Sequence, residues 1–140
     1  MKEILVKYIR NLQQEARMGE HRLIIDEPKE FGGDGKGPDP YDLLLSGLGG
    51  CTAMTLLSYA KRKDIPLEGV QIKLNHEKVH ASDCDTCETK EGKLDQITKT
   101  IYLQGPLNQE QKESLLEIAK RCPVHRTLTS ENKIIDKVGG

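Results

Sequence analysis

Four cysteines are the residues of this 140-residue chain best suited to chemistry: Cys51, Cys84, Cys87 and Cys122. They are too few and too widely spread for the disulfide framework of a small secreted protein. A thiolate can act as a nucleophile or a metal ligand, whereas a buried neutral thiol behaves as a small hydrophobic group. Catalysis, metal binding and simple core packing are therefore the three alternatives for each cysteine.

Cys51 and Cys122 each follow an apolar stripe with helical spacing, which predicts that both lie on the buried face of a long helix. If the two helices pack together over a sheet, the thiols come within reach of each other. Gly49 and Gly50 precede Cys51 and cost about 1 kcal/mol each in a helix, so we expect backbone or substrate to approach closely there. Packing of both thiols as core residues remains the alternative.

A nucleophilic thiol also needs a nearby cation, because only the thiolate reacts and burial raises the pKa of a thiol. The sequence does not choose among four candidates, namely Arg17, Arg22, His125 and Arg126. His125 has two possible roles near Cys122: it lowers the pKa of that thiol, or it only hydrogen-bonds the end of a helix.

The second pair of cysteines belongs to a set with the spacing of a metal site: His76, His80, Cys84 and Cys87. Thiolate and imidazole are the ligands that zinc prefers. The acidic neighbours Asp83, Asp85 and Glu88 are equally typical of a solvated loop. A zinc clip, an auxiliary redox dithiol and a loop without special chemistry therefore all stay open.

The elements that must position these residues alternate between strands and helices. We predict a hairpin over 2–26, a loop over 28–38, a helix from Asp39 to about Lys61, strands over 70–79 and 97–103, a helix from Asn108 to Cys122, a short helical turn, and a last strand at 134–135. Ile97, Ile101 and Leu103 share the inner face of their strand, and Lys99 is the charged exception on it. This order predicts an α+β fold with a largely antiparallel sheet.

The composition narrows the class of protein further. Basic and acidic side chains number 21 and 22 and leave a net charge of −1, which gives no field to attract nucleic acid. The chain contains one Phe and no Trp, so the core is expected to be aliphatic. We see no apolar run approaching the roughly 20 residues of a membrane span and no signal peptide. We expect one domain over 1–140 in the cytoplasm, without nucleic-acid or membrane partners.

Three segments resemble the OsmC/Ohr family, which comprises osmotically inducible protein C and the organic hydroperoxide resistance proteins. They are GKGPDPYDLLL from Gly35, GGCTAM around Cys51, and CPVH from Cys122. The resemblance implies an OsmC-like α+β fold in which an antiparallel sheet packs on two long central helices. It also implies an intertwined homodimer with active sites at the subunit interface.

The same resemblance implies a thiol-dependent peroxidase that reduces organic, and also hydrogen, peroxides. Cys51 matches the peroxidatic cysteine and Cys122 the resolving cysteine, while Arg17 matches the arginine at the thiolate, with Arg22 as the alternative. An external dithiol must then reset the pair, and family members use lipoyl groups. No cofactor and no catalytic metal are implied.

The resemblance fails at Tyr41, where family peroxidases carry a glutamate that orients the arginine. Asp42 follows directly, but one residue rotates a helical side chain by about 100°, so Asp42 does not simply replace it. The chain is therefore more similar to the broader OsmC-like branch. The alternative function is a non-enzymatic small-molecule binding or stress protein on the same fold, with or without a structural zinc site.

Overall fold

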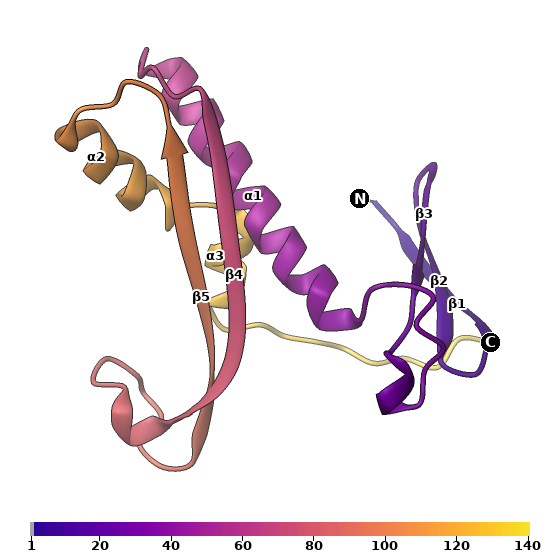
Figure 1. Cartoon of the computed structure of the whole chain (residues 1–140). Coiled ribbons are helices and arrows are strands. Elements are labelled where there is room, and N and C mark those ends of the chain that lie inside the picture. Colours follow the sequence, from indigo (N-terminus) through magenta and orange to yellow (C-terminus); the bar gives the residue numbers. More distant parts are fainter. Residues whose placement is uncertain (1) are drawn as a thin grey trace. The chain divides into compact units, whose positions relative to one another are not determined.

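The computed structural model describes residues 2–140, which form two compact units, one up to Ser46 and one from Gly47 onward (Figure 1). The first unit holds a three-stranded antiparallel sheet and a long loop. The second holds a two-stranded antiparallel sheet and helices. The α+β class with antiparallel pairing is therefore confirmed, with two sheets rather than one.

The N-terminal sheet consists of β1 (Ile4–Arg10), β2 (Gln13–Met18) and β3 (His21–Ile25) in the order β1-β2-β3. The predicted turn at Gly19 is present, with φ 64°. A second turn at Asn11, with φ 48°, makes a three-stranded meander where we predicted a hairpin. The middle strand was missed because its sequence QQEARM is mostly polar and has no apolar alternation.

The loop after β3 contains η1 (Lys29–Phe31) and is organised by the buried carboxylate of Asp26. Its oxygens accept the backbone N–H groups of Glu27 at 2.8 Å, Asp34 at 3.1 Å and Lys36 at 3.0 Å. The Lys36 hydrogen bond is the main cause that lowers the pKa of Asp26, against the opposing effect of burial. Gly33 is required here, because a Cβ atom would lie 1.9 Å from the Glu27 carbonyl oxygen.

We expect Asp26→Asn to loosen this loop, because an amide NH₂ would face backbone donors. Amide hydrogen exchange at Asp34 and Lys36 should become about tenfold faster, as expected for a lost hydrogen bond to a charged acceptor. Since the folded pKa is lowered, the wild-type carboxylate stabilises the loop above its unfolded pKa of about 3.9 and loses this effect as the pH falls further. The variant should lack this acid-dependent step, and the exposed Glu30→Gln serves as the control in the same loop.

The helix α1 (Pro40–Arg62) begins where predicted. The Asp39 and Asp42 side chains each accept the other's backbone N–H, at 2.8 and 3.0 Å, and Pro40 occupies the first helical position. By length and composition alone α1 could cross a membrane, although the core helix of a soluble protein passes the same test.

In the C-terminal unit, β4 (Gly69–His80) and β5 (Lys93–Gln104) pair antiparallel from Gly69↔Gln104 to His80↔Lys93. The remaining elements are η2 (Ala81–Asp83), α2 (Gln109–Ala119) and α3 (Pro123–Leu128). Asn108 caps α2 as predicted, with a capping box to Gln111. The predicted strand at 134–135 is absent, because these residues are exposed and pair with no strand among residues 2–140.

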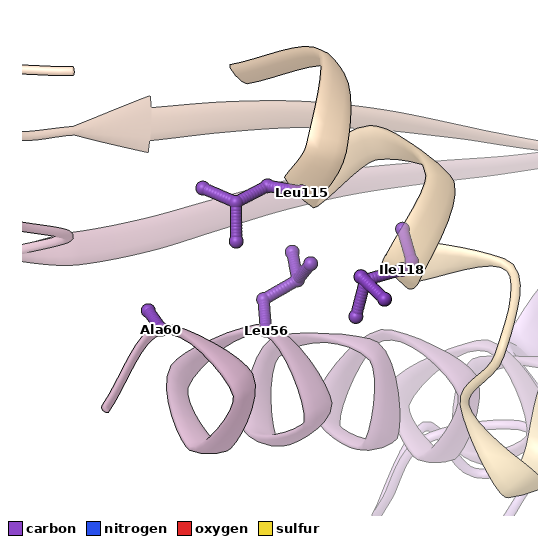
Figure 2. Close-up of a cluster of buried hydrophobic side chains, with 5 residues drawn as sticks. Leu56, Ala60, Leu115 and Ile118 are labelled. Carbon is purple, nitrogen blue, oxygen red and sulfur yellow. The ribbon is translucent and has the colours of Figure 1, made fainter. Parts of the chain in front are cut away.

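The core of this unit lies between α1 and α2 (Figure 2). Leu56 and Ala60 of α1 meet Leu115 and Ile118 of α2, and Leu56 and Leu115 have no exposed surface. Partly buried aliphatic residues of both strands, including Val70, pack against this cluster. The aliphatic core expected from the composition is present, and it holds α1 and α2 in fixed positions around the thiols.

Candidate active site

Two neighbouring residues of α1 point toward the C-terminal cysteine. Cys51 is half-buried, while Thr52 is fully buried. The Thr52 hydroxyl lies 2.9 Å from the Leu48 carbonyl oxygen and 3.4 Å from Cys122 Sγ. A hydroxyl has one proton to donate, so Thr52 can give it either to the helix carbonyl or to the sulfur. It can therefore respond to the charge on Cys122.

Cys122 does not lie on α2, contrary to our expectation, because that helix ends at Ala119. It is instead the N-cap of α3, where its sulfur accepts the backbone N–H of His125 at 3.2 Å. The side chains of Cys51 and Cys122 are hydrogen-bonded to each other, and both thiols are free. The structure thus brings together the two cysteines that the sequence suggested could meet.

Close packing beside Cys51 explains one of the two preceding glycines. A Cβ atom at Gly49 would lie 2.7 Å from Leu74 Cδ1, so β4 approaches α1 at this point. Gly50 has nothing within 4 Å of such an atom, and no packing requirement is visible there. A close approach is therefore present at Gly49 only, and it is made by a leucine side chain and not by the backbone or substrate that we expected.

Lys99 is the cation of this cluster. It is paired with Leu74 in the sheet register and points inward from β5. Its Nζ donates to Thr52 Oγ1 at 3.0 Å and to the Ala119 carbonyl at 3.2 Å. A third contact, at 3.0 Å, joins Nζ to Nδ1 of His125. Among residues 2–140 no carboxylate forms an ion pair with Lys99, so its charge is directed at the thiols.

Opposing effects act on the Cys122 thiol. Burial would raise its pKa, but hydrogen bonds from the Thr52 hydroxyl and the His125 backbone N–H stabilise the thiolate. The hydrogen bond with Cys51 and the charge of Lys99 act in the same direction. Together they lower the pKa of Cys122 below its usual value, so a thiolate is favoured in a buried place.

The ring of His125 does not supply the positive charge. Burial and then the charges of Lys99 and Lys120 lower its pKa, so the imidazole is neutral at neutral pH. Its Nδ1 can then accept a hydrogen bond from the Lys99 ammonium group. His125 therefore helps to lower the pKa of Cys122, as one of its two suggested roles requires, but it does so through its backbone N–H, while its ring contacts Lys99.

Arg17 and Arg22 belong to the N-terminal unit, where they are opposite each other in the pairing of β2 with β3. Arg17 Nε lies 2.6 Å from a carboxylate oxygen of Glu15. The contact of either arginine with the Cys51 thiolate stays a prediction from the family resemblance.

The other candidate set is not gathered into a metal site. Cys84 and Cys87 are joined by a disulfide, and His76 Nε2 lies 2.8 Å from Asp95. Within the described part of the chain, no group of three or more His, Cys, Asp or Glu side chains is arranged to hold a metal ion. This pairing leaves the zinc alternative without a ligand set and favours the redox dithiol.

A cavity of about 210 Å³ opens beside Lys99 and His125. Its remaining lining residues are mostly apolar and come from α1, β5 and the end of α3: Leu48, Asp95, Ile97, Leu128 and Thr129. It therefore offers a small compartment whose lining combines the Lys99 cation and the Asp95 carboxylate with three aliphatic side chains.

Sequence reasoning did not find Lys99 and Thr52 as site residues. Lys99 carried a signal, since it is the charged residue at an inward position of an otherwise apolar strand face. Thr52 carried none, because a threonine inside a helix is ordinary.

The fold and the site define an α+β thiol protein, in which two free cysteines lie beside a partly buried lysine. The family model described as OsmC-like protein matches residues 33–135, and the chain belongs to this family. No curated protein matches the chain.

Solved structures share the fold at low sequence identity. An organic hydroperoxide resistance protein OsmC from Legionella pneumophila is 23% identical, with a TM-score of 0.68 over 92% of this chain and 89% of that one. An OsmC-like protein from Mycoplasma pneumoniae is 23% identical, with a TM-score of 0.69 over 91% of this chain and 86% of that one. An OsmC-like protein of unknown function from Vibrio cholerae is 11% identical, with a TM-score of 0.68 over 94% of this chain and 95% of that one. These similarities establish the OsmC-like fold.

Proposed function

We propose that the chain is a thiol-dependent peroxidase that reduces organic hydroperoxides through Cys51 and Cys122. The observation that carries this proposal is the hydrogen bond between two free thiols next to the Lys99 charge. Two thiols in contact can be oxidised to a disulfide with little movement, and a nearby cation stabilises the thiolate that starts the reaction. The family, which includes proteins named for organic hydroperoxide resistance, supports the same activity.

Exposure distinguishes the roles of the two sulfurs. Cys51 is half-buried and can be reached from outside, whereas Cys122 has no exposed surface. A hydroperoxide must therefore be attacked by Cys51, and Cys122 is placed to react with the oxidised Cys51 from inside. This assigns Cys51 as the peroxidatic and Cys122 as the resolving cysteine.

The lowered pKa of Cys122 is compatible with this assignment because a thiolate at Cys122 can accept the proton of the Cys51 S–H group. Loss of one proton gives a thiolate on one sulfur that accepts the S–H of the other. The proton can shift to Cys122 when Cys51 attacks, and Lys99 stabilises the negative charge on either side.

The chemical steps balance as follows. The Cys51 thiolate attacks the outer oxygen of the hydroperoxide, the O–O bond breaks, and the alkoxide leaves as alcohol after taking a proton. Cys51 is then a sulfenic acid. The Cys122 thiolate attacks its sulfur, the S–O bond breaks, and the disulfide forms while hydroxide leaves and takes up a proton to become water. An external dithiol reduces this disulfide and is itself oxidised, and the resemblance suggests a lipoyl group for this step.

Other parts of the proposal come from the resemblance. We include a homodimer in which Arg17 contributes to the thiolate environment, and a cytoplasmic location. The cavity beside Lys99, with Leu48, Ile97 and Leu128, supports a preference for an organic over a hydrogen peroxide.

The proposal is tested with the reduced protein and one equivalent of an alkyl hydroperoxide, without a reductant. We expect one hydroperoxide to be consumed per chain, with loss of two thiols and a peptide-mapped disulfide between Cys51 and Cys122. Addition of dihydrolipoamide should restore both thiols. Unchanged hydroperoxide, with both thiols still free after prolonged incubation, would contradict the proposal.

Tyr41 favours a second candidate, a non-enzymatic binding protein. It lies at the position where family peroxidases carry a glutamate that orients the arginine. In that case the cavity at Lys99 binds a small ligand and the thiols have no turnover. The same experiment decides, because a binding protein would leave the hydroperoxide intact.

A further inference from the structure

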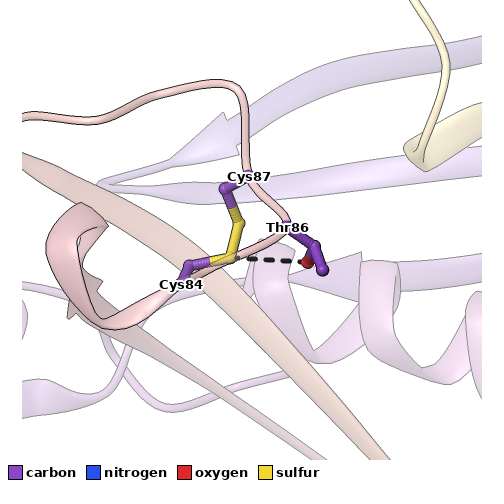
Figure 3. The surroundings of a disulfide bond; sticks show 3 residues. All are labelled: Cys84, Thr86 and Cys87. Atoms are coloured by element: carbon purple, nitrogen blue, oxygen red, sulfur yellow. Dashed lines mark hydrogen bonds between the residues drawn. A yellow bond between two sulfur atoms is a disulfide. The ribbon is translucent and has the colours of Figure 1, made fainter.

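We propose that the Cys84–Cys87 disulfide is a second redox site, which exchanges with thiols that carry no negative charge. It lies in the loop between β4 and β5, where the structure joins the two sulfurs and places Thr86 beside them (Figure 3). This proposal is independent of the peroxidase chemistry at Cys51.

The hairpin does not need this disulfide for its stability. The strands are paired as far as His80↔Lys93, and the N–H of Ala81 donates to the Gly92 carbonyl at 2.8 Å, which closes the base of the loop. The disulfide joins residues three positions apart. Because the entropic effect of a cross-link grows with the length of the closed loop, a disulfide across such a short loop adds little to the free energy of unfolding. We therefore interpret the Cys84–Cys87 pair as a site of thiol chemistry and not as a structural cross-link.

The site is separated from the Cys51–Cys122 pair along the hairpin. Lys99, which contacts the first pair, lies opposite Leu74, and the loop begins beyond His80↔Lys93. Six residues of extended strand span about 20 Å, so the two pairs do not exchange directly within one chain. Cys84 and Cys87 are half-buried and bonded, whereas Cys51 and Cys122 are free. They therefore react with external thiols separately.

Negative charge surrounds this disulfide. Asp83, Asp85 and Glu88 are exposed, and no ion pair within residues 2–140 involves any of them. Lys90 and Glu91 follow and cancel each other in charge. A thiolate with a further negative group is repelled by this segment, while a cationic thiolate is attracted, and salt screens both effects. The charge defines the chemical class of the exchanging thiol.

The two sulfurs differ in their surroundings. The Thr86 hydroxyl lies 3.9 Å from Cys84 Sγ and can donate to a thiolate formed there (Figure 3). A sulfur that is stabilised as a thiolate is the better leaving group. We therefore assign Cys87 as the sulfur that is attacked. The incoming thiolate forms a bond to Cys87, the Cys84–Cys87 bond breaks, and Cys84 leaves as a thiolate; a second thiol then releases Cys87 and becomes a disulfide with the first.

The test uses the full chain with Cys51→Ser and Cys122→Ser, so that Cys84 and Cys87 are its only cysteines. Its disulfide is reduced with aminoethanethiol, mercaptoethanol and mercaptoethanesulfonate at equal thiolate concentrations. We expect the cationic reagent to react fastest and the anionic one slowest, by about tenfold overall at low ionic strength, with the difference decreasing in salt. The matched control, with Asp83→Asn, Asp85→Asn and Glu88→Gln added, should lose the salt-dependent part of this difference and keep only the intrinsic reactivities of the three thiolates. Equal rates in the parent, or a bond that resists all three reagents, would overturn the proposal.

A second measurement tests the assignment of the attacked sulfur. Acid quenching during the reaction should trap the reagent as a mixed disulfide on Cys87, located by peptide mass analysis. In Thr86→Val the adduct should divide between Cys84 and Cys87, because the hydroxyl that favours one leaving group is gone. An adduct mainly on Cys84 in the parent would contradict the assignment. Since this protein lacks both active-site thiols, failure of the peroxidase proposal leaves the result unaffected.

Discussion

Replacement of Cys51 by serine is expected to abolish hydroperoxide consumption, by at least about a thousandfold. Serine keeps the size of the side chain but has no accessible anion at neutral pH, and the buried Cys122 is not reachable by a hydroperoxide. The measurement is the loss of an alkyl hydroperoxide in the presence of excess dithiol. Full activity in this variant would rule out the mechanism.

Replacement of Cys122 by serine should have a different effect. Cys51 can still attack once, but no second thiol is in contact to form the disulfide. One equivalent of hydroperoxide should therefore be consumed, and a sulfenate-trapping reagent should label Cys51. A double variant with Cys84→Ser and Cys87→Ser is the matched control and should keep full turnover, since this pair lies elsewhere on the hairpin. Loss of turnover in the control would show that the two pairs are coupled.

The regular elements were predictable where local chemistry determines them. The start of α1 depends on Asp39, Pro40 and Asp42, and the start of α2 on Asn108, and all four act as the sequence indicates. β2 was not predictable in this way. Its residues are polar, and it is a strand because it pairs with neighbours on both sides, which is a property of the sheet and not of its own side chains.

The site was predictable only in part, for a related reason. The two cysteines could be named from their spacing, but the cation could not, because it comes from a strand distant in sequence from both. Lys99 stands out only when the inward face of β5 is known. The helix α2 ends at Ala119, so Cys122 is the cap of α3 and not the end of α2. Pro123 is the only sequence signal for this change of helix.

Lys99→Met should slow the reaction at neutral pH by about tenfold and move the pH–rate profile to higher pH. The lysine charge lowers the pKa of Cys122, so its removal raises the pKa of this thiol and decreases the fraction of Cys122 thiolate that can take the Cys51 proton. The rate should approach that of the wild type as the pH rises, because the thiolate then forms without the cation. The measurement is the pH dependence of alkylation of Cys51 by iodoacetamide, together with hydroperoxide consumption.

A merely structural role of Lys99 would give a different pattern. Methionine also leaves the Ala119 carbonyl without its donor, and a general loosening of the fold would lower activity at every pH. Lys99→Arg keeps the charge and should keep the alkylation profile near that of the wild type, even where turnover falls. Lys93→Met removes an exposed lysine from the same strand and should change neither profile. An unshifted profile in Lys99→Met would show that the thiolate depends on another cation, and would return that role to Arg17.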